Sequence, residues 1–158
     1  MINDLVIEDG ALDNKVLEEL YNEALELSGL VVEYFQVNKK ETLAHLNIDL
    51  LGSYTLECNR ITTGIMQAIS WCLMQKGVKS GEITVDFASE KKNRLTDNEL
   101  FSEDLNCDPE PLPKEFINYS ERTRALYIRI VRIDRLLYEN NGSIENPVHN
   151  MMNKIEKI

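Results

Sequence analysis

Apolar residues recur every three or four positions along most of residues 12 to 76. In the first such series the steps alternate between three and four residues, which places its members on one stripe of an α-helix. This spacing predicts a first amphipathic helix. The members of the series are Leu17, Leu20, Ala24, Leu27, Val31 and Tyr34.

A second helix is predicted after a polar break near Asn38. Asn38 and Glu41 have the spacing of an N-cap and the third helical residue, so this helix is expected to begin at Asn38 and to cover residues 42–76. Gly52 and Gly64 lie inside it, and Gly64 indicates either a kink or a close helix crossing. The apolar series of this helix is Leu43, Leu46, Leu50, Tyr54, Cys58, Ile61, Ile65, Ala68 and Cys72.

A third helix is expected to start at Pro113, since proline is favoured at the first helical position. Asn140, Asn141 and Gly142 should end it. Its apolar series again alternates between steps of three and four residues. The members are Phe116, Tyr119, Thr123, Leu126, Ile130, Ile133 and Leu137.

The intervening residues 77–112 have a weaker pattern, with six acidic residues and no basic one from Asp97 to Glu110, and are expected to form an acidic connector. The predicted fold is an all-α, antiparallel three-helix bundle. Residues 1–142 should form this domain, and residues 143–158 a flexible C-terminal tail. A four-helix bundle with the connector as a helix fits less well, because Gly, Asp, Asn and Pro accumulate in the connector.

The chain has 158 residues, which suits one domain, and its 17 basic and 27 acidic residues give a net charge of −10. This charge disfavours nucleic-acid binding by the whole surface. The longest uncharged stretch, residues 61–75, is too short to span a membrane, and we recognise no signal peptide. Three cysteines without CxxC spacing favour reduced thiols. A cytoplasmic protein is therefore expected.

No constellation of residues in the sequence predicts catalysis. His45 and His149 have no acid or cysteine at ligand spacing, so neither a metal nor another cofactor is expected. Cys58 and Cys72 are interpreted as small core residues rather than nucleophiles. Because nucleotide-binding and hydrolase motifs are also absent, we do not expect an enzyme.

The third helix carries unusual charge, because residues 113–139 have a local charge of +2 in an otherwise acidic chain. Arg122, Arg129 and Arg132 fall within a sector of about 80°. They could pair with acids of the bundle itself, form a basic stripe for an acidic protein partner, or contact DNA. The tail offers three apolar residues for adaptable partner contacts: Met151, Met152 and Ile155.

Residues 54–71 resemble the signature of the RcdA family (regulator of CtrA degradation), Y-x-x-E-x-x-R-L-T-T-R-L-M-Q-x-x-S-W. Gly64 stands where the family has arginine, and weaker similarity extends over about residues 17 to 138. The matching positions in the signature are Tyr54, Glu57, Arg60, Thr62, Thr63, Met66, Gln67, Ser70 and Trp71.

The resemblance implies a three-helix-bundle homodimer in the cytoplasm of alphaproteobacteria. It also implies a non-catalytic adaptor that helps to deliver cell-cycle regulators, as protein cargo, to the ClpXP protease, together with a response-regulator-like priming factor. Glu57 and Arg60 join the arginines of the third helix as candidate contact residues. Two rival functions remain: a small transcriptional regulator or DNA-associated protein that uses those arginines, and a structural dimerisation module.

Overall fold

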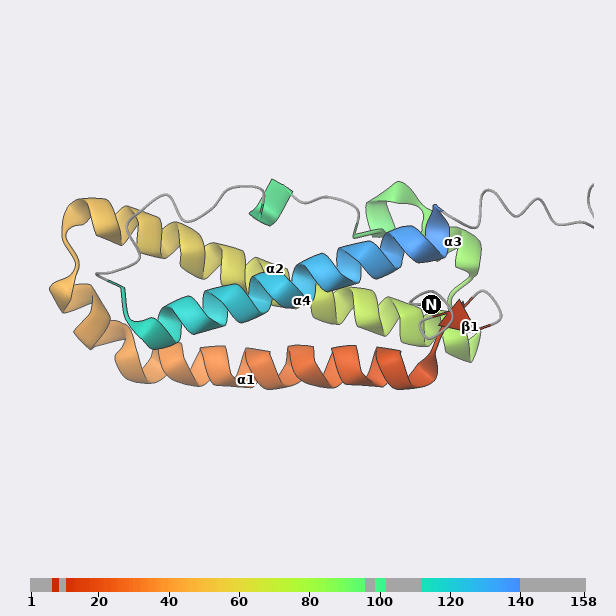
Figure 1. Ribbon diagram of the computed structural model, residues 1–158, viewed down its shortest axis with the longest axis horizontal. Coiled ribbons are helices and arrows are strands. Elements are labelled where there is room, and N and C mark those ends of the chain that lie inside the picture. Colours follow the sequence, from red (N-terminus) through yellow and green to blue (C-terminus); the bar gives the residue numbers. More distant parts are fainter. Residues whose placement is uncertain (1–6, 9–10, 96–98, 102–111, 140–158) are drawn as a thin grey trace, which may run out of the picture.

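Three long helices pack side by side in the computed structural model (Figure 1). They are α1 (Asn14–His45), α2 (Ile48–Ser80) and α4 (Lys114–Tyr138). The predicted helical bundle is thereby confirmed. The structure describes residues 7–8, 11–95, 99–101 and 112–139.

Short elements occupy the rest of the described chain. Strands β1 (Ile7–Glu8) and β2 (Ala11–Leu12) form a small antiparallel hairpin before α1. Between α2 and α4 lie the helix α3 (Val85–Ser89) and two 3₁₀ turns, η1 (Lys91–Asn93) and η2 (Glu99–Phe101).

The start of the connector was predicted too early, because α2 continues to Ser80 and is closed by Gly81. Gly81 has a φ of 80°, in the left-handed region that glycine adopts without steric cost. Within the described part of residues 77–112, the longest helix after α2 has five residues. The described part of this segment therefore contains no fourth long helix of the kind that the four-helix alternative requires.

The boundary between the first two helices was also predicted wrongly. Asn38 lies inside α1, where its side-chain amide donates to the carbonyl of Tyr34, 3.2 Å away. An asparagine can make this bond back to the preceding turn, so it need not interrupt a helix. The N-cap of α2 is instead Asn47, whose side-chain oxygen accepts from the backbone N–H of Leu50 at 2.9 Å.

The direction of the helices differs in part from the antiparallel prediction. α1 runs against both partners, but α2 and α4 run parallel (Figure 1). Three side-chain pairs between α2 and α4 have the same separation of 63 residues, as parallel packing in register requires. They are Glu57–Ser120, Trp71–Asp134 and Gln75–Tyr138. The chain can return to the starting end because more than thirty residues link the two helices.

The predicted apolar series of the first and third helices are buried throughout. In α2 the series is buried at Tyr54, Ile61, Ile65, Ala68 and Cys72, whereas Leu43, now in α1, is exposed. At the centre of the bundle, a Cβ on Gly64 would lie 2.9 Å from the ring of Phe101 and 3.0 Å from Thr123 of α4. Gly64 therefore permits close packing.

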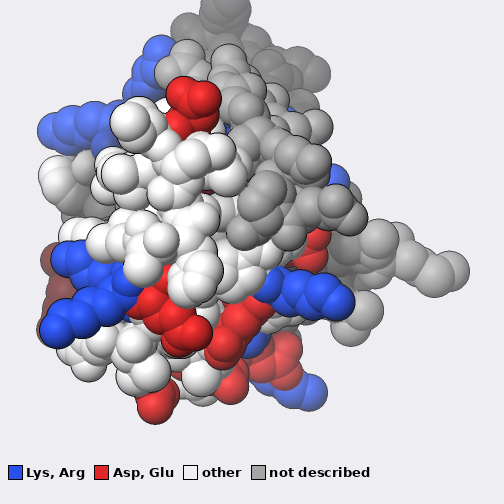
Figure 2. Space-filling view, turned by 90° about the vertical axis from the view of Figure 1, so that its left-hand side faces the viewer, with Lys and Arg blue, Asp and Glu red and all other residues white. Residues whose placement is uncertain are grey.

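The end of the bundle at the α1–α2 junction has a largely uncharged surface. Figure 2 faces this end and shows uncharged side chains over a continuous central area, with most charged side chains below it and a few above it. The exposed large apolar residues of this part of the chain are Val37, Leu43, Ile48 and Leu51.

Candidate functional site

The signature of residues 54–71 divides between the two sides of α2. Tyr54 and Trp71 point into the bundle and are buried, so that they serve the core. The exposed signature residues are Thr62, Thr63, Met66, Gln67 and Ser70. A helical period of 3.6 residues places Thr63, Met66, Gln67 and Ser70 next to one another on the outer surface of α2, within about two turns.

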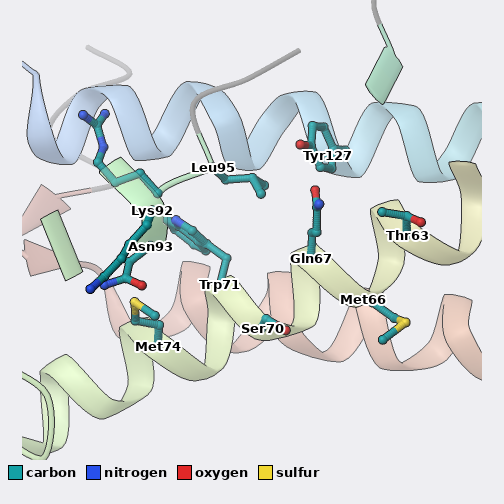
Figure 3. A pocket seen from close by; sticks show the side chains of 11 residues that line it. Thr63, Met66, Gln67, Ser70, Trp71, Met74, Lys92, Asn93, Leu95 and Tyr127 are labelled. Atoms are coloured by element: carbon teal, nitrogen blue, oxygen red, sulfur yellow. The ribbon is translucent and has the colours of Figure 1, made fainter. Parts of the chain in front are cut away.

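A groove of about 550 Å³ runs along this outer surface (Figure 3). Its first wall is the α2 surface, with Met74 one turn beyond Ser70. Its second wall comes from the segment after α3 and from Tyr127 of α4 (Figure 3). The residues of the second wall are Lys92, Asn93, Arg94, Leu95 and Tyr127. The groove therefore joins segments that lie far apart in the sequence.

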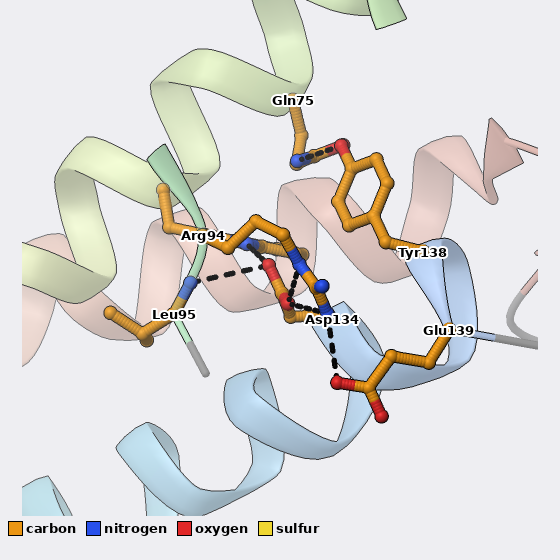
Figure 4. Close-up of polar contacts among 7 residues, drawn as sticks. Gln75, Arg94, Leu95, Asp134, Tyr138 and Glu139 are labelled. Atoms are coloured by element: carbon orange, nitrogen blue, oxygen red, sulfur yellow. Dashed lines mark hydrogen bonds and ion pairs between the residues drawn. The ribbon is translucent and has the colours of Figure 1, made fainter. Parts of the chain in front are cut away.

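Asp134 of α4 fixes the second wall (Figure 4). Its carboxylate is fully buried; one oxygen accepts from Trp71 Nε1 at 2.9 Å and from the backbone N–H of Leu95 at 3.3 Å. The other oxygen accepts from Arg94 Nε at 2.9 Å. A buried charge is tolerated when it is paired and hydrogen-bonded in this way. This cluster fastens the connector to the bundle just beside the groove.

Arg94 and Tyr138 extend the cluster to the end of α4 (Figure 4). The guanidinium of Arg94 also pairs with Glu139 at 3.2 Å, and it lies 5.3 Å from the centre of the Tyr138 ring. The Tyr138 hydroxyl accepts from Gln75 Nε2 at 3.0 Å. α2, the segment after α3 and the end of α4 thus meet through polar contacts, which makes this end of the groove a preformed surface.

A second polar contact ties α2 to α4 near the other end of the signature. Glu57 is 2% exposed and accepts a hydrogen bond from the hydroxyl of Ser120. Arg60 Nη1 lies 3.4 Å from the other carboxylate oxygen of Glu57. Glu57, a candidate contact residue in the sequence, is therefore engaged inside the fold, and only the partly exposed Arg60 reaches the surface.

The candidate arginines of α4 do not form one uniform stripe. Arg129 is half exposed and pairs with Glu23 of α1. Arg132 is exposed, with no ion pair to another described residue, and lines a pocket of about 510 Å³ between α1 and α4 together with Arg129. Arg122 lies outside this pocket and is partly buried. Arg129 thus pairs with an acid of the bundle itself, whereas a partner-binding role for Arg122, Arg129 and Arg132 stays a prediction.

The described cysteines have the properties of core residues. Burial raises the pKa of the Cys72 thiol to about 12 and that of the Cys58 thiol to about 11. Both thiols therefore stay protonated near neutral pH, whereas a nucleophilic cysteine needs a lowered pKa. Cys107 lies outside the described residues.

The remaining candidates add no chemistry to the site. His45 makes a 2.8 Å contact with the backbone carbonyl of Glu41. Among the described residues, no group of three His, Cys, Asp or Glu side chains could hold a metal ion, and no helix has the length and apolar character that crossing a membrane requires. The tail candidates Met151, Met152 and Ile155 lie outside the described residues, as does His149.

Sequence reasoning missed the second wall of the groove. Lys92, Arg94 and Leu95 fall in the segment that was read as a connector, and their position depends on contacts with Asp134, about forty residues later. The sequence contained no clear signal, because acidic residues next to a buried apolar position are common: Glu18 follows Leu17 in the same way as Asp134 follows Ile133, yet Glu18 is exposed.

The chain was compared with known proteins. A search of curated protein sequences found no match. The crystal structure of RcdA from Caulobacter crescentus CB15 is similar, with a TM-score of 0.64 and 25% sequence identity; the match covers 84% of this chain and 98% of that chain. This match confirms the resemblance to RcdA. A family model described as "Protein of unknown function (DUF1465)" matches residues 9–158, and the chain therefore belongs to that family.

Proposed function

We propose that this protein is a non-catalytic, cytoplasmic adaptor that helps to deliver cell-cycle regulatory proteins to the ClpXP protease. The RcdA family, which the signature and the fold resemble, implies this role and a response-regulator-like priming factor as co-partner. The raised pKa values of Cys58 and Cys72 support a role without a thiol nucleophile.

One observation carries the proposal: the exposed half of the signature lines a groove instead of packing in the core. Thr63, Met66, Gln67 and Ser70 make up most of one wall. Met66 is 63% exposed and, with Met74, adds apolar surface to this wall. An adaptor needs such surfaces because it acts only through contacts with other proteins.

The pocket between α1 and α4 offers a second contact surface. Arg129 and Arg132 lie there beside apolar side chains of Val16 and Leu136. Glu19 and Glu23 also line this pocket, and Glu23 pairs with Arg129, so Arg132 is the arginine there that supports contact with an acidic protein partner. This α1–α4 pocket lies on a different side of α4 from Tyr127, which faces the groove.

A homodimer is part of the proposal, and the outer surface of α1 and α2 supports it. Lys76 Nζ lies 4.4 Å from the centre of the Tyr21 ring, which fixes how these antiparallel helices pair. Leu25 lies one turn after Tyr21 and Leu73 one turn before Lys76, so in this antiparallel pair both fall on the same side, and both are exposed. Val32 continues this face, which we call the α1–α2 face.

A reconstituted degradation assay tests the adaptor role. The reaction contains a ClpXP-type protease, its priming factor and a labelled cell-cycle regulator as cargo, with and without this protein. The protein should accelerate loss of the cargo. Combined replacement of Arg122, Arg129 and Arg132 with Glu should slow delivery, mainly through association and its salt dependence. Deletion of residues 143–158 should also slow it.

The variants need a stability control, since only folded protein is informative. Exposed ion pairs contribute about 0–1 kcal/mol each, so helicity should be nearly unchanged in the arginine variant. If the parent protein does not accelerate degradation, the adaptor role is wrong. Salt-sensitive binding to duplex DNA that the arginine variant loses would instead support the DNA-associated alternative.

A further inference from the structure

The groove along α2 offers hydrogen-bonding groups that the fold itself does not use. Thr63, Gln67 and Ser70 make no side-chain hydrogen bond to any described residue. Thr62, by contrast, donates to the carbonyl of Cys58 at 2.9 Å on the same helix. The three unused groups stand about one turn apart and face the groove (Figure 3). They can therefore bond the backbone or side chains of an extended or helical ligand.

Two methionines give the same wall an apolar surface that can adapt. Met66 is exposed and Met74 is half-buried, and they lie at opposite ends of the groove wall (Figure 3). Methionine is unbranched and polarizable, so it adjusts to ligands of different shape. Between them lies the indole of Trp71, which forms part of the floor and is 3% exposed. This wall suits an apolar side chain of a ligand.

The charge of the groove is opposite to the charge of the chain. Among the described residues, Lys92 and Arg94 line the groove and no acidic residue does, whereas the whole chain carries −10. Arg94 already has Asp134 and Glu139 as partners. Lys92 pairs with the exposed Glu90 at 2.8 Å and lies 5.5 Å from the centre of the Phe87 ring, and its side chain is still 68% exposed. Lys92 is therefore the cation that an incoming carboxylate can reach.

The second wall is held in place before any ligand arrives. Asp134 binds both the side chain of Arg94 and the backbone N–H of Leu95. A preformed wall lowers the ordering cost of binding. Apolar walls, unused hydrogen-bonding groups and a reachable cation together describe a peptide-binding groove.

We infer that the α2 groove binds a short amphipathic segment of a partner protein. The segment places an apolar side chain between Met66 and Met74, and an acidic side chain at Lys92. This inference rests on the proposed adaptor function, and it names the class of partner segment that the adaptor takes. Charge complementarity selects an acidic segment over a basic one.

Selection from a random 12-residue peptide library, displayed against the full-length protein, tests the inference. Enriched peptides should combine acidic with apolar residues. Synthetic copies that lack tryptophan are then titrated into the protein, because Trp71 is the single tryptophan of the chain and lies at the groove. Its fluorescence should change in a saturable way that weakens with salt.

Matched variants separate the groove from the rest of the surface. Lys92→Glu should weaken peptide binding by about tenfold, which corresponds to about 1.4 kcal/mol. Lys91→Glu makes the same charge change at an exposed neighbour outside the groove lining and should stay within about twofold of the parent. Met66→Glu should likewise weaken binding, whereas Val37→Glu, on another exposed apolar residue, should not.

Each outcome decides the question. Enrichment of basic or neutral peptides, absence of enrichment, or equal effects of the Lys91 and Lys92 changes would overturn the inference. The degradation assay with the same variants distinguishes the two proposals. If the peptides bind at the groove but the protein does not deliver cargo, the adaptor role is wrong and peptide binding at the groove is supported. If the protein delivers cargo but Met66→Glu binds peptide normally, peptide binding at the groove is wrong and the adaptor role is supported.

Discussion

Trp71 donates its indole N–H to the buried carboxylate of Asp134 over 2.9 Å, although 63 residues separate them in the chain. The bond joins the signature of α2 to α4. Through the other contacts of Asp134, it also joins both helices to Arg94 and Leu95 at the groove. Core packing and the shape of the candidate site therefore depend on the same carboxylate.

Removal of the Asp134 carboxylate should destabilise the protein strongly. Asp134→Ala leaves the Arg94 guanidinium and the Trp71 N–H without their partner, so the free energy of unfolding should fall by about 3–5 kcal/mol. Trp71→Phe keeps most of the ring but loses one donor, and should cost about 1–3 kcal/mol. Urea unfolding followed by circular dichroism measures both. Asp86→Ala, at an exposed residue of α3, serves as the control. Equal stabilities of the Asp134 and Asp86 variants would contradict the role of the cluster.

Two glycines of α2 should respond to alanine with opposite signs. In Gly64→Ala the new methyl group would press on Phe101 and Thr123, and Phe101 is itself packed against Tyr127 at 5.1 Å between ring centres. We expect a loss of about 1–3 kcal/mol. In Gly52→Ala the methyl group meets nothing within 4 Å, and the higher helix propensity should add up to about 1 kcal/mol.

The comparison of thermal unfolding midpoints for these two variants is the relevant measurement. A stabilised Gly64→Ala protein would show that Phe101 does not pack tightly over this position.

Stability should fall in alkaline solution because of the buried thiols. Burial raises the pKa of Cys72 from 9.0 to about 12, and that of Cys58 from 9.0 to about 11. The folded state therefore holds these protons more tightly than the unfolded state. The stability that these two protonated thiols contribute is fully present below pH 9, and it is lost as the pH rises through about 9 to 12.

The urea midpoint should be lower at about pH 10 than at about pH 8, and Cys72→Ala should reduce the difference. Thiol labelling gives an independent measurement. In a Cys107→Ser background, Cys72 should react with a thiol reagent much more slowly in the native protein than in urea. Rapid labelling of native Cys72 at neutral pH would show that this thiol is accessible.

The α1–α2 face should control self-association. Burial of Leu25, Val32 and Leu73 against a second copy removes exposed apolar surface, which favours a twofold dimer. Light scattering at micromolar concentration should give twice the 18.2 kDa mass of one chain. Leu25→Glu with Leu73→Glu should return the mass to that of one chain, whereas Val37→Glu, on a different side of α1, should leave it unchanged. A parent protein of 18.2 kDa would contradict the dimer.

The sequence by itself determined which side of each helix is buried. Alternation of three- and four-residue steps predicted the inward residues of α1 and α4, because a helical period of 3.6 places such positions on one stripe whatever the partner is. The same rule could not locate the break between α1 and α2. Asn38 and Asn47 are both asparagines, and only packing decides which one bonds back into its helix and which one caps the next.

Only the tertiary structure decided the direction of α4 and the existence of the groove. A long connector is compatible with either direction, and the choice follows from contacts such as Trp71–Asp134 between residues that are distant in sequence. The exposed signature residues were visible in the sequence, but their opposite wall was not. Lys92 and Leu95 lie at the groove because Asp134 binds the side chain of Arg94 and the backbone of Leu95. Residue spacing cannot predict a contact between positions about forty residues apart.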